Sequence, residues 1–214
     1  VSFTGSTEVG RKLLKVASDQ VLKTSMELGG NAPLIVFDDA DMETAVDGCM
    51  VAKMRNLGEA CTAANRIYVH ENVAEEFKDK FSQRMGSLKV GNGLDKTVDV
   101  GPLVNAETRD KVAYFVKDAI EKGAELSVGG ESIDGPGFYY PPTVLFNVPD
   151  SSECLNDEIF GPVAAIQTFK DTEDVITRAN NTEYGLVAYV FTEEMKKGMQ
   201  VCERLDYGMV GLNR

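Results

Sequence analysis

The short apolar run Leu34-Ile35-Val36-Phe37 constrains the fold of this chain more than any other feature. Four consecutive apolar residues between a glycine turn and an acidic segment are typical of a strand that is buried on both faces. Similar strand-like runs recur along the chain, and segments with helical periodicity separate them. This alternation predicts an α/β fold, a three-layer α/β/α arrangement around a largely parallel sheet.

The predicted elements follow one another along the whole chain. The expected strands cover residues 1–4, 24–28, 34–37, 66–70, 124–128, 164–169, 186–192 and 209–212, the first of them as a buried strand. The expected helices cover residues 7–18, 38–57, 73–88, 105–122, 172–180 and 193–205. Residues 138–145 form an extended run whose adjacent prolines, Pro141 and Pro142, predict that it stays out of the interior of a sheet.

Charge and cysteine content exclude several classes of function. The formal net charge of -12 argues against a nucleic-acid or anionic-membrane surface, and no apolar run is long enough to span a bilayer. The single histidine, His70, and the wide spacing of Cys49, Cys61, Cys154 and Cys202 predict no metal site and no Ser-His-Asp triad. Scattered cysteines of this kind favour a reducing, cytoplasmic location.

Cys61 is the strongest candidate for a reactive residue. It lies in Gly58-Glu59-Ala60-Cys61-Thr62-Ala63, where small and polar neighbours offer little apolar surface. A free cysteine is usually an inert core residue, whereas a thiol on an open turn near backbone N–H groups can act as a nucleophile. The local sequence leaves both interpretations open. Cys49, by contrast, lies on the apolar face of the preceding helix and is expected to be core filler.

Glu27 is a second candidate, because it ends a strand-like segment just before Gly29 and Gly30. The two glycines allow a sharp backbone turn. A carboxylate in an apolar segment costs free energy unless it is paired or used in chemistry. The alternative is an exposed carboxylate at the end of a strand.

Gly5 and Ser6 form a small-residue turn between the first strand and the first helix. A helix that begins after such a turn can bind a phosphate, because its free N–H groups and its dipole favour an anion. Ser6 could equally be a plain N-cap without a ligand. The turn matches neither a GxGxxG fingerprint nor a Walker loop.

Four motifs together resemble the NAD(P)-dependent aldehyde dehydrogenase family. They are Phe3-Thr4-Gly5-Ser6-Thr7, Met26-Glu27-Leu28-Gly29-Gly30-Asn31, Gly58-Glu59-Ala60-Cys61 and Glu158-Ile159-Phe160-Gly161-Pro162-Val163. Their order and separations are those of the family, and the resemblance covers essentially all 214 residues. Residues 52–56 and 207–213 are most similar to the branch that oxidises succinate semialdehyde.

The resemblance implies a mechanism through a covalent intermediate. Cys61 would attack the aldehyde carbon to give a thiohemiacetal, whose oxyanion the Cys61 backbone N–H would help to stabilise. Loss of hydride to the cofactor would leave a thioester. Glu27 would be the general base that activates water to hydrolyse the thioester, a role that an apolar environment suits.

The resemblance also implies a nicotinamide cofactor, either NAD or NADP. Glu158 would bind the nicotinamide ribose hydroxyls, and Phe160 would pack on the nicotinamide ring. Gly5 and Ser6 would lie by the pyrophosphate, and Leu28 would contribute to the same cofactor site.

The small-molecule aldehyde is expected to be bound through Arg55, six residues before Cys61. In the semialdehyde branch this arginine pairs with the distal carboxylate of the substrate, for which a guanidinium is well suited. The alternative is a surface salt bridge at the helix end. Glutarate semialdehyde and other short aldehydes remain competing substrates. A cysteine acyl-transferase or thioesterase that never uses a nicotinamide is the competing class of enzyme.

The family's architecture implies that residues 1–29 end the cofactor-binding domain and that residues 30–214 form the catalytic domain. The opening Val1-Ser2-Phe3-Thr4 and the absence of an initiator Met suggest a fragment of a longer chain. We therefore expect little or no dehydrogenase activity from the 214 residues alone, and a homo-dimer or homo-tetramer for the full-length protein. One departure is Glu59, which stands where the family usually has Gln.

Overall fold

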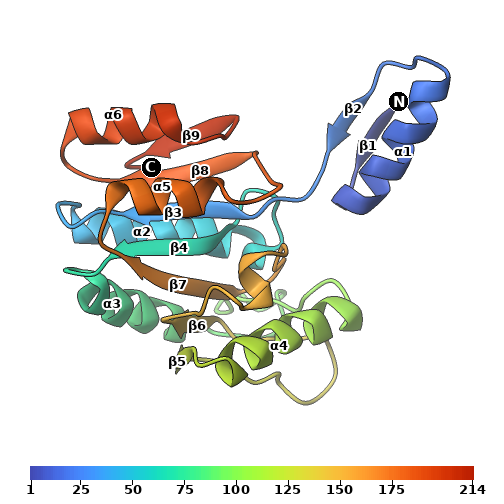
Figure 1. The fold of residues 1–214 in the computed structure, drawn as a ribbon. Coiled ribbons are helices and arrows are strands. Elements are labelled where there is room, and N and C mark those ends of the chain that lie inside the picture. Colours follow the sequence, from blue (N-terminus) through green and yellow to red (C-terminus); the bar gives the residue numbers. More distant parts are fainter.

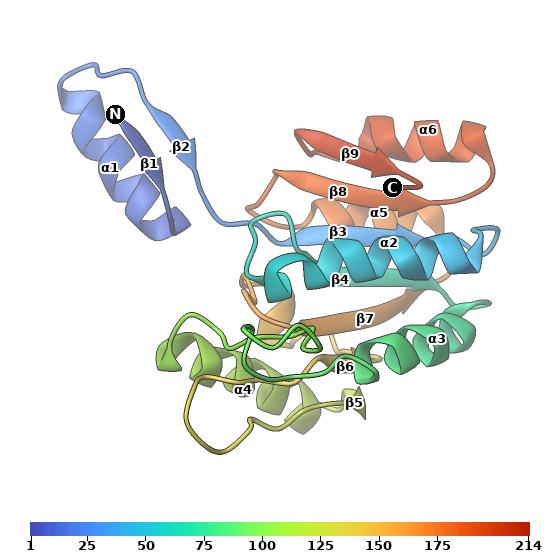
Figure 2. The ribbon, with the colours of Figure 1, turned by 180° about the vertical axis from the view of Figure 1, so that it is seen from behind.

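A computed structural model describes residues 1–214 and shows two parts of unequal size (Figure 1). The smaller part consists of β1 (Ser2–Thr4), α1 (Thr7–Asp19) and β2 (Ser25–Glu27), with β1 and β2 paired in parallel. It is set apart from the larger part in both views (Figures 1 and 2). The prediction that the first strand is buried is wrong, since Ser2 and Thr4 are exposed. Only α1 packs on this two-stranded sheet, so the sheet has one uncovered face.

The larger part is built on a seven-stranded sheet with the strand order β5-β6-β7-β4-β3-β8-β9. The strands are β3 (Ala32–Val36), β4 (Ala64–His70), β5 (Glu125–Val128), β6 (Thr143–Phe146), β7 (Val163–Phe169), β8 (Val187–Phe191) and β9 (Met209–Leu212). Every neighbouring pair is parallel except β5 and β6, which confirms the predicted largely parallel α/β sheet.

Helices cover both faces of this sheet (Figures 1 and 2). They are α2 (Met42–Met54), α3 (Ala74–Gly86), α4 (Ala106–Glu121), α5 (Thr172–Asn180) and α6 (Met195–Arg204), with 3-10 turns η1 (Arg55–Gly58) and η2 (Glu153–Leu155). The residues of α2 and α3 share one hydrophobic cluster, whereas those of α4, α5 and α6 belong to clusters on the opposite face. The predicted three-layer arrangement is therefore confirmed.

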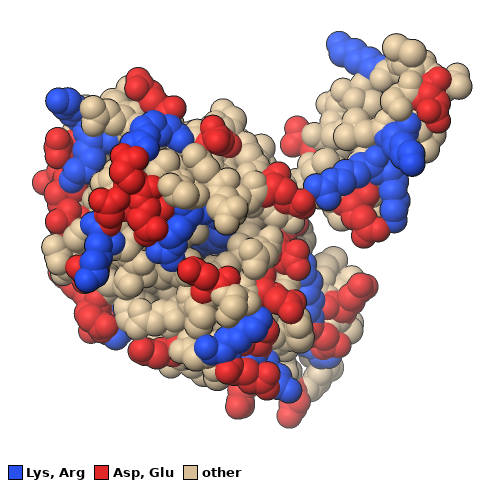
Figure 3. Space-filling model, viewed as in Figure 1, with Lys and Arg blue, Asp and Glu red and all other residues tan.

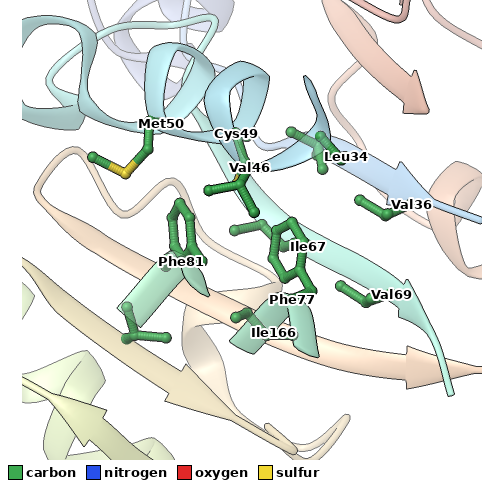
Figure 4. Packing of buried hydrophobic residues seen from close by; sticks show 14 of the residues in the cluster. Leu34, Val36, Val46, Cys49, Met50, Ile67, Val69, Phe77, Phe81 and Ile166 are labelled. Atoms are coloured by element: carbon green, nitrogen blue, oxygen red, sulfur yellow. The ribbon is translucent and has the colours of Figure 1, made fainter. Parts of the chain in front are cut away.

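The central strand β3 explains why the apolar run is continuous. Successive side chains of a strand point to opposite faces, so Leu34 and Val36 pack with α2 and α3 while Ile35 packs with α5 and α6. Figure 4 shows Leu34 and Val36 in the first of these clusters, with Phe77 of α3. Cys49 lies in the same cluster, fully buried, as predicted for core filler.

Helix α2 is shorter than the predicted helix 38–57. Asp41 caps its first turn, with Oδ1 accepting a hydrogen bond from the Thr44 N–H at 2.8 Å, so the helix begins only after this residue. At its other end the backbone leaves the helical conformation after Met54 and forms η1. The chain between this helix end and β4 carries the candidate nucleophile.

Strand β6 corrects the prediction made from the two prolines. It lies between β5 and β7, in the interior of the sheet. Pro141 and Pro142 precede the strand, and its ladder with the β7 side begins at Thr143, whose N–H donates to the Pro162 carbonyl at 2.8 Å. Both prolines therefore lie before the first residue of β6 that must donate a backbone hydrogen bond to the neighbouring strand.

Acidic and basic side chains are interspersed over the face seen in Figure 3, without a continuous basic surface there. None of the helices combines the length and apolar character needed to cross a bilayer. No group of three or more His, Cys, Asp or Glu side chains is arranged to hold a metal ion.

Candidate active site

Three loops meet at the amino ends of three adjacent strands. Gly30 lies just before β3, Cys61 just before β4 and Phe160 just before β7. These strands are parallel neighbours in the order β7-β4-β3, so their amino ends share one edge of the sheet. Segments far apart in the sequence are thereby brought together beside the candidate nucleophile.

Glycines allow the three loops to approach one another closely. A Cβ atom on Gly30 would lie 1.9 Å from the Cys61 carbonyl oxygen, and one on Gly29 would lie 2.6 Å from Oε2 of Glu158. A Cβ on Gly58 would lie 2.2 Å from the carbonyl oxygen of Gly161. The Gly30 and Gly58 positions face backbone atoms and so require glycine, whereas the atom nearest to Gly29 is the end of the flexible Glu158 side chain.

The turn that presents Cys61 has an unusual backbone. Asn56, Leu57 and Gly58 have φ values of 50°, 61° and 77°, in the left-handed region. Such a conformation costs about 1–3 kcal/mol for each non-glycine residue, and it persists where surrounding contacts hold it. One such contact is the hydrogen bond from Asn56 Nδ2 to the Glu59 carbonyl at 2.9 Å.

Cys61 itself is half-buried on a turn, with a free thiol. Its backbone N–H donates no hydrogen bond to another backbone group. An incoming oxygen atom can therefore accept from this N–H, as an oxyanion does in acyl-transfer sites. The thiol and a free donor thus lie on the same residue.

A cavity of about 590 Å³ lies between the two parts of the chain, in front of these loops. It brings together the residues that the sequence predicted for the nucleophile, the base and the cofactor: Gly5, Ser6, Glu27, Leu28, Cys61, Glu158 and Phe160. Two residues of α4, Thr108 and Lys111, also line it. Nothing in the sequence distinguished these two from the other residues of a solvated helix face.

Glu27 ends β2 on the wall of this cavity. Its side chain is exposed, which is one of the two environments that the sequence left open. The strand belongs to the small two-stranded sheet of β1 and β2. Water can reach the carboxylate from the cavity.

Glu158 is held by the Gly30 turn. The Gly30 N–H donates to Oε1 of Glu158 at 3.0 Å, and Lys111 Nζ donates to the Glu158 carbonyl at 2.6 Å. Burial raises the pKa of the Glu158 carboxyl, and the Gly30 N–H together with the charges of Lys111 and Lys53 opposes that rise. Oε2 has no hydrogen-bond partner in the chain, so it can accept hydrogen bonds from a ligand's hydroxyl groups.

Phe160 follows two residues later with a φ of 55°. A bulky residue in the left-handed region is rare, and such conformations cluster at functional sites. The conformation leaves Phe160 half-buried on the cavity wall, where it provides apolar surface. This wall and the free Glu158 oxygen lie in the same cavity.

Glu59, which stands where the family usually has Gln, has a hydrogen-bond partner in the structure. Its Oε1 accepts a hydrogen bond from the Val104 N–H at 3.0 Å, which ties the loop before α4 to the nucleophile turn. Burial raises the pKa of the Glu59 carboxyl, and the Val104 N–H opposes the rise. The carbonyl oxygen of a glutamine could accept the same hydrogen bond.

A second, smaller cavity of about 160 Å³ lies on the other side of the nucleophile turn. It is lined by Arg55, Arg214, Tyr189 and Thr62, and Ala60 lines both cavities. Arg55 is therefore in the adjoining cavity rather than in the large one. The Tyr189 hydroxyl donates to the Thr62 carbonyl at 2.8 Å, which fixes the chain just after the cysteine.

The two arginines of the small cavity are candidate anion-binding groups. Neither Arg55 nor Arg214 forms a salt bridge in the structure. Two guanidinium groups beside one cavity repel each other, and an anionic ligand would relieve this repulsion. The sequence did not single out Tyr189 or Arg214, because no local pattern connects them to Cys61.

Comparison with known proteins gives the class. The model of a protein family described as "Aldehyde dehydrogenase family" matches residues 1–214. The chain belongs to the aldehyde dehydrogenase family, as its motifs predicted. A succinate-semialdehyde dehydrogenase of Paenarthrobacter nicotinovorans is 53% identical over 213 residues, which is 100% of this chain and 47% of that protein. A glutarate-semialdehyde dehydrogenase of Pseudomonas putida is 44% identical, over 100% of this chain and 44% of that protein.

Solved structures of similar proteins agree with this family assignment. An NADP-dependent enzyme of E. coli superposes with a TM-score of 0.96 at 45% identity, over 99% of this chain and 44% of that one. An aldehyde dehydrogenase of Bacillus cereus, solved as an NAD+ complex, gives a TM-score of 0.95 at 37% identity, over 100% of this chain and 43% of that one. The chain thus spans about half the length of the proteins that it matches.

Proposed function

We propose that this chain carries the catalytic residues of an enzyme that oxidises an aldehyde to its carboxylic acid with NAD or NADP, through a covalent intermediate on Cys61. The observation that carries the proposal is the position of the nucleophile turn between two cavities of different character. The large cavity suits a dinucleotide and the small one suits a short anionic substrate. Cys61 lines the large cavity, and its chain neighbours Ala60 and Thr62 line the small one.

The residues of the large cavity fit a nicotinamide cofactor. Glu158 offers a free carboxylate oxygen to the ribose hydroxyls, and Phe160 offers an apolar surface to the nicotinamide ring. Gly5 and Ser6, at the amino end of α1, would lie by the pyrophosphate, with Leu28 beside them. When bound, the nicotinamide accepts a hydride. The E. coli and Bacillus cereus neighbours are named for NADP and NAD+, so the proposal keeps both.

The chain's own residues would perform the remaining steps. The Cys61 sulfur adds to the aldehyde carbon, and the Cys61 N–H donates to the oxyanion of the thiohemiacetal. Loss of hydride converts this adduct into a thioester. Glu27 takes a proton from a water molecule, which then attacks the thioester carbonyl and releases the acid and the thiol. The open position of Glu27 on the cavity wall supports its access to water.

The proposed substrate is succinate semialdehyde. Arg55 would pair with its distal carboxylate, and Arg214 on the same small cavity adds positive charge. The 53% identity to a succinate-semialdehyde dehydrogenase supports this choice. Glutarate semialdehyde is the second candidate, because it has the same distal carboxylate and the Pseudomonas putida relative is named for it.

A cysteine acyl-transferase or thioesterase is the competing class of enzyme. It would use Cys61 and Glu27 without a cofactor. The Glu158 carboxylate, held by Gly30 with one oxygen free, and the apolar wall of Phe160 have no role in such an enzyme. These two features favour the dehydrogenase.

We further propose that residues 1–29 end the cofactor-binding domain and that residues 30–214 form the catalytic domain. The separation of the small part from the large one supports this division (Figure 1). A homo-dimer or homo-tetramer of the full-length protein remains part of the proposal. Four free cysteines support a cytoplasmic location.

The test compares substrates with the complete gene product. Formation of reduced cofactor would be measured with succinate semialdehyde, glutarate semialdehyde and an uncharged aldehyde of similar length. We expect the highest kcat/KM for succinate semialdehyde. Equal values for charged and uncharged aldehydes would contradict the substrate proposal, and no reduced cofactor from any aldehyde would contradict the dehydrogenase. The 214 residues alone are expected to show little or no activity.

A further inference from the structure

Lys53 is the one fully buried lysine of the chain, and the proposed mechanism does not use it. It lies near the end of α2, beneath the nucleophile turn, with 0% of its surface exposed. Lysine is almost never fully buried without a partner, because desolvation of an ammonium group is costly. Its hydrogen-bond partner is the amide of Asn65, which is also buried and lies in β4.

The partner of Lys53 links it to the turn before β3. Lys53 Nζ donates to Asn65 Oδ1 at 2.8 Å. An ammonium group has donors only, so Asn65 must turn its oxygen toward Lys53 and its amide nitrogen the other way. Asn65 Nδ2 then donates to the carbonyl of Gly30 at 3.5 Å. The Gly30 N–H in turn donates to Glu158 at 3.0 Å.

The stem of Lys53 also contacts the turn that presents Cys61. Its Cε lies 3.2 Å from the position of a Cβ on Gly58, and on the other side this position faces the Gly161 carbonyl. Lys53 therefore lies where the loops before β3, β4 and β7 approach one another. Its removal would loosen contacts that no other side chain replaces.

We propose that Lys53 is a positioning residue for the cofactor site, which holds the Gly30 turn through Asn65 and thereby fixes the carboxylate of Glu158. The inference rests on the proposed role of Glu158 in binding the cofactor ribose. Lys53 itself does not line the large cavity. Asn65 is the intermediate through which Lys53 acts.

The role requires a donor of this length rather than a fixed charge. Burial lowers the pKa of Lys53 to about 7, and the nearby Cys49 of α2, Cys154 of η2 and Glu158 oppose this effect. A neutral amine still has N–H groups and can keep its hydrogen bond to Asn65. The position of the Gly30 turn is therefore expected to persist on both sides of neutral pH.

The test is the Lys53→Met variant of the complete gene product, since methionine has a similar length but no donor. Binding of the reduced cofactor would be followed by its fluorescence, and kinetics would give the KM for the aldehyde. We expect the cofactor Kd to rise about tenfold, as the loss of a single positioning contact does, with the aldehyde KM within about twofold of the parent value. Cys49→Ala, one turn earlier on the buried face of α2, is the matched control and should leave both values unchanged.

The Asn65→Leu variant tests the same positioning role, and it can be used even if Lys53→Met fails to fold. It should raise the cofactor Kd by a similar factor, and the double variant should be no weaker than either single one, because both act through one contact. A cofactor Kd within twofold of the parent in either folded variant overturns the inference. A parent protein that binds no nicotinamide cofactor would instead overturn the proposed function.

Discussion

The backbone of Gly30 lies against the carbonyl oxygen of Cys61 so closely that a Cβ atom on Gly30 would be only 1.9 Å from it. The same Gly30 donates its N–H to Glu158 and accepts a hydrogen bond from Asn65. One glycine thus connects the proposed nucleophile, the proposed cofactor carboxylate and the buried Lys53–Asn65 pair. The arrangement of the site therefore depends strongly on Gly30, although this residue has no side chain.

Gly30→Ala is therefore expected to inactivate the enzyme without unfolding it. The added methyl group must push the Cys61 turn away, at a cost of about 1–3 kcal/mol in stability. A displacement of the nucleophile by about 1 Å can lower the rate by about a hundredfold. Turnover and urea denaturation would measure both effects. Gly93→Ala is the control, because a Cβ there meets nothing within 4 Å, and a similar loss in that variant would show that the effect is not specific.

Arg55→Gln should lower kcat/KM for succinate semialdehyde by about 10- to 100-fold, which corresponds to the loss of a charged hydrogen bond. The value for an uncharged aldehyde should change by less than about twofold. Arg214→Gln is expected to have an effect of the same kind, because Arg214 lines the same cavity. Arg204→Gln, which removes a surface pair with Glu173, is the control. Equal losses for charged and uncharged aldehydes would contradict the proposed role of Arg55.

Glu59→Gln is expected to change how stability depends on pH. Because burial raises the pKa of Glu59, the native state binds its proton more tightly than the unfolded state does. The contribution of Glu59 to stability is therefore full below the unfolded value of about 4.5 and is lost as the pH rises through the native value. The variant lacks this loss, so it should gain stability relative to the parent as the pH rises. Urea denaturation from about pH 4 to about pH 7, the region in which a carboxyl group with a raised pKa titrates, would measure the difference. A constant difference would contradict it.

Lys53→Met should alter stability in the opposite pH range. The pKa of Lys53 is lowered from 10.5 to about 7 in the native state, so the unfolded chain binds more protons between these values. The free energy of unfolding of the parent should therefore rise with pH from about 7 to 10.5. The variant should lack this rise. Equal pH profiles in denaturation experiments would show that Lys53 is not desolvated as described.

The layers of the fold could be predicted because they depend on local patterns. The run at residues 34–37 indicated a strand buried on both faces, and β3 packs on α2 and α3 with one side and on α5 and α6 with the other. The prolines at 141 and 142 misled the prediction for β6, because what matters is whether a proline falls on a paired residue of the strand, and both precede it.

The arrangement of the site could be predicted only in part. The motifs named residues that do line one cavity, but the sequence could not show that Arg55 faces a second cavity or that Glu27 is exposed. Both depend on how separate segments pack. The site also lies at the amino ends of the parallel strands, whereas ligands in open α/β sheets usually bind at the carboxyl ends. Lys53 was visible only as a lysine on an apolar helix face, without its partner in β4.

The most direct test of the central claim is the covalent state of Cys61 in a Glu27→Gln variant of the complete gene product. Without the general base, one turnover should form a thioester that hydrolyses slowly. After mixing with oxidised cofactor and succinate semialdehyde, mass spectrometry should find a succinyl group on Cys61, together with one equivalent of reduced cofactor per site. Omission of the cofactor should abolish the adduct. An adduct on another residue, or reduced cofactor without any acylated cysteine, would contradict the account.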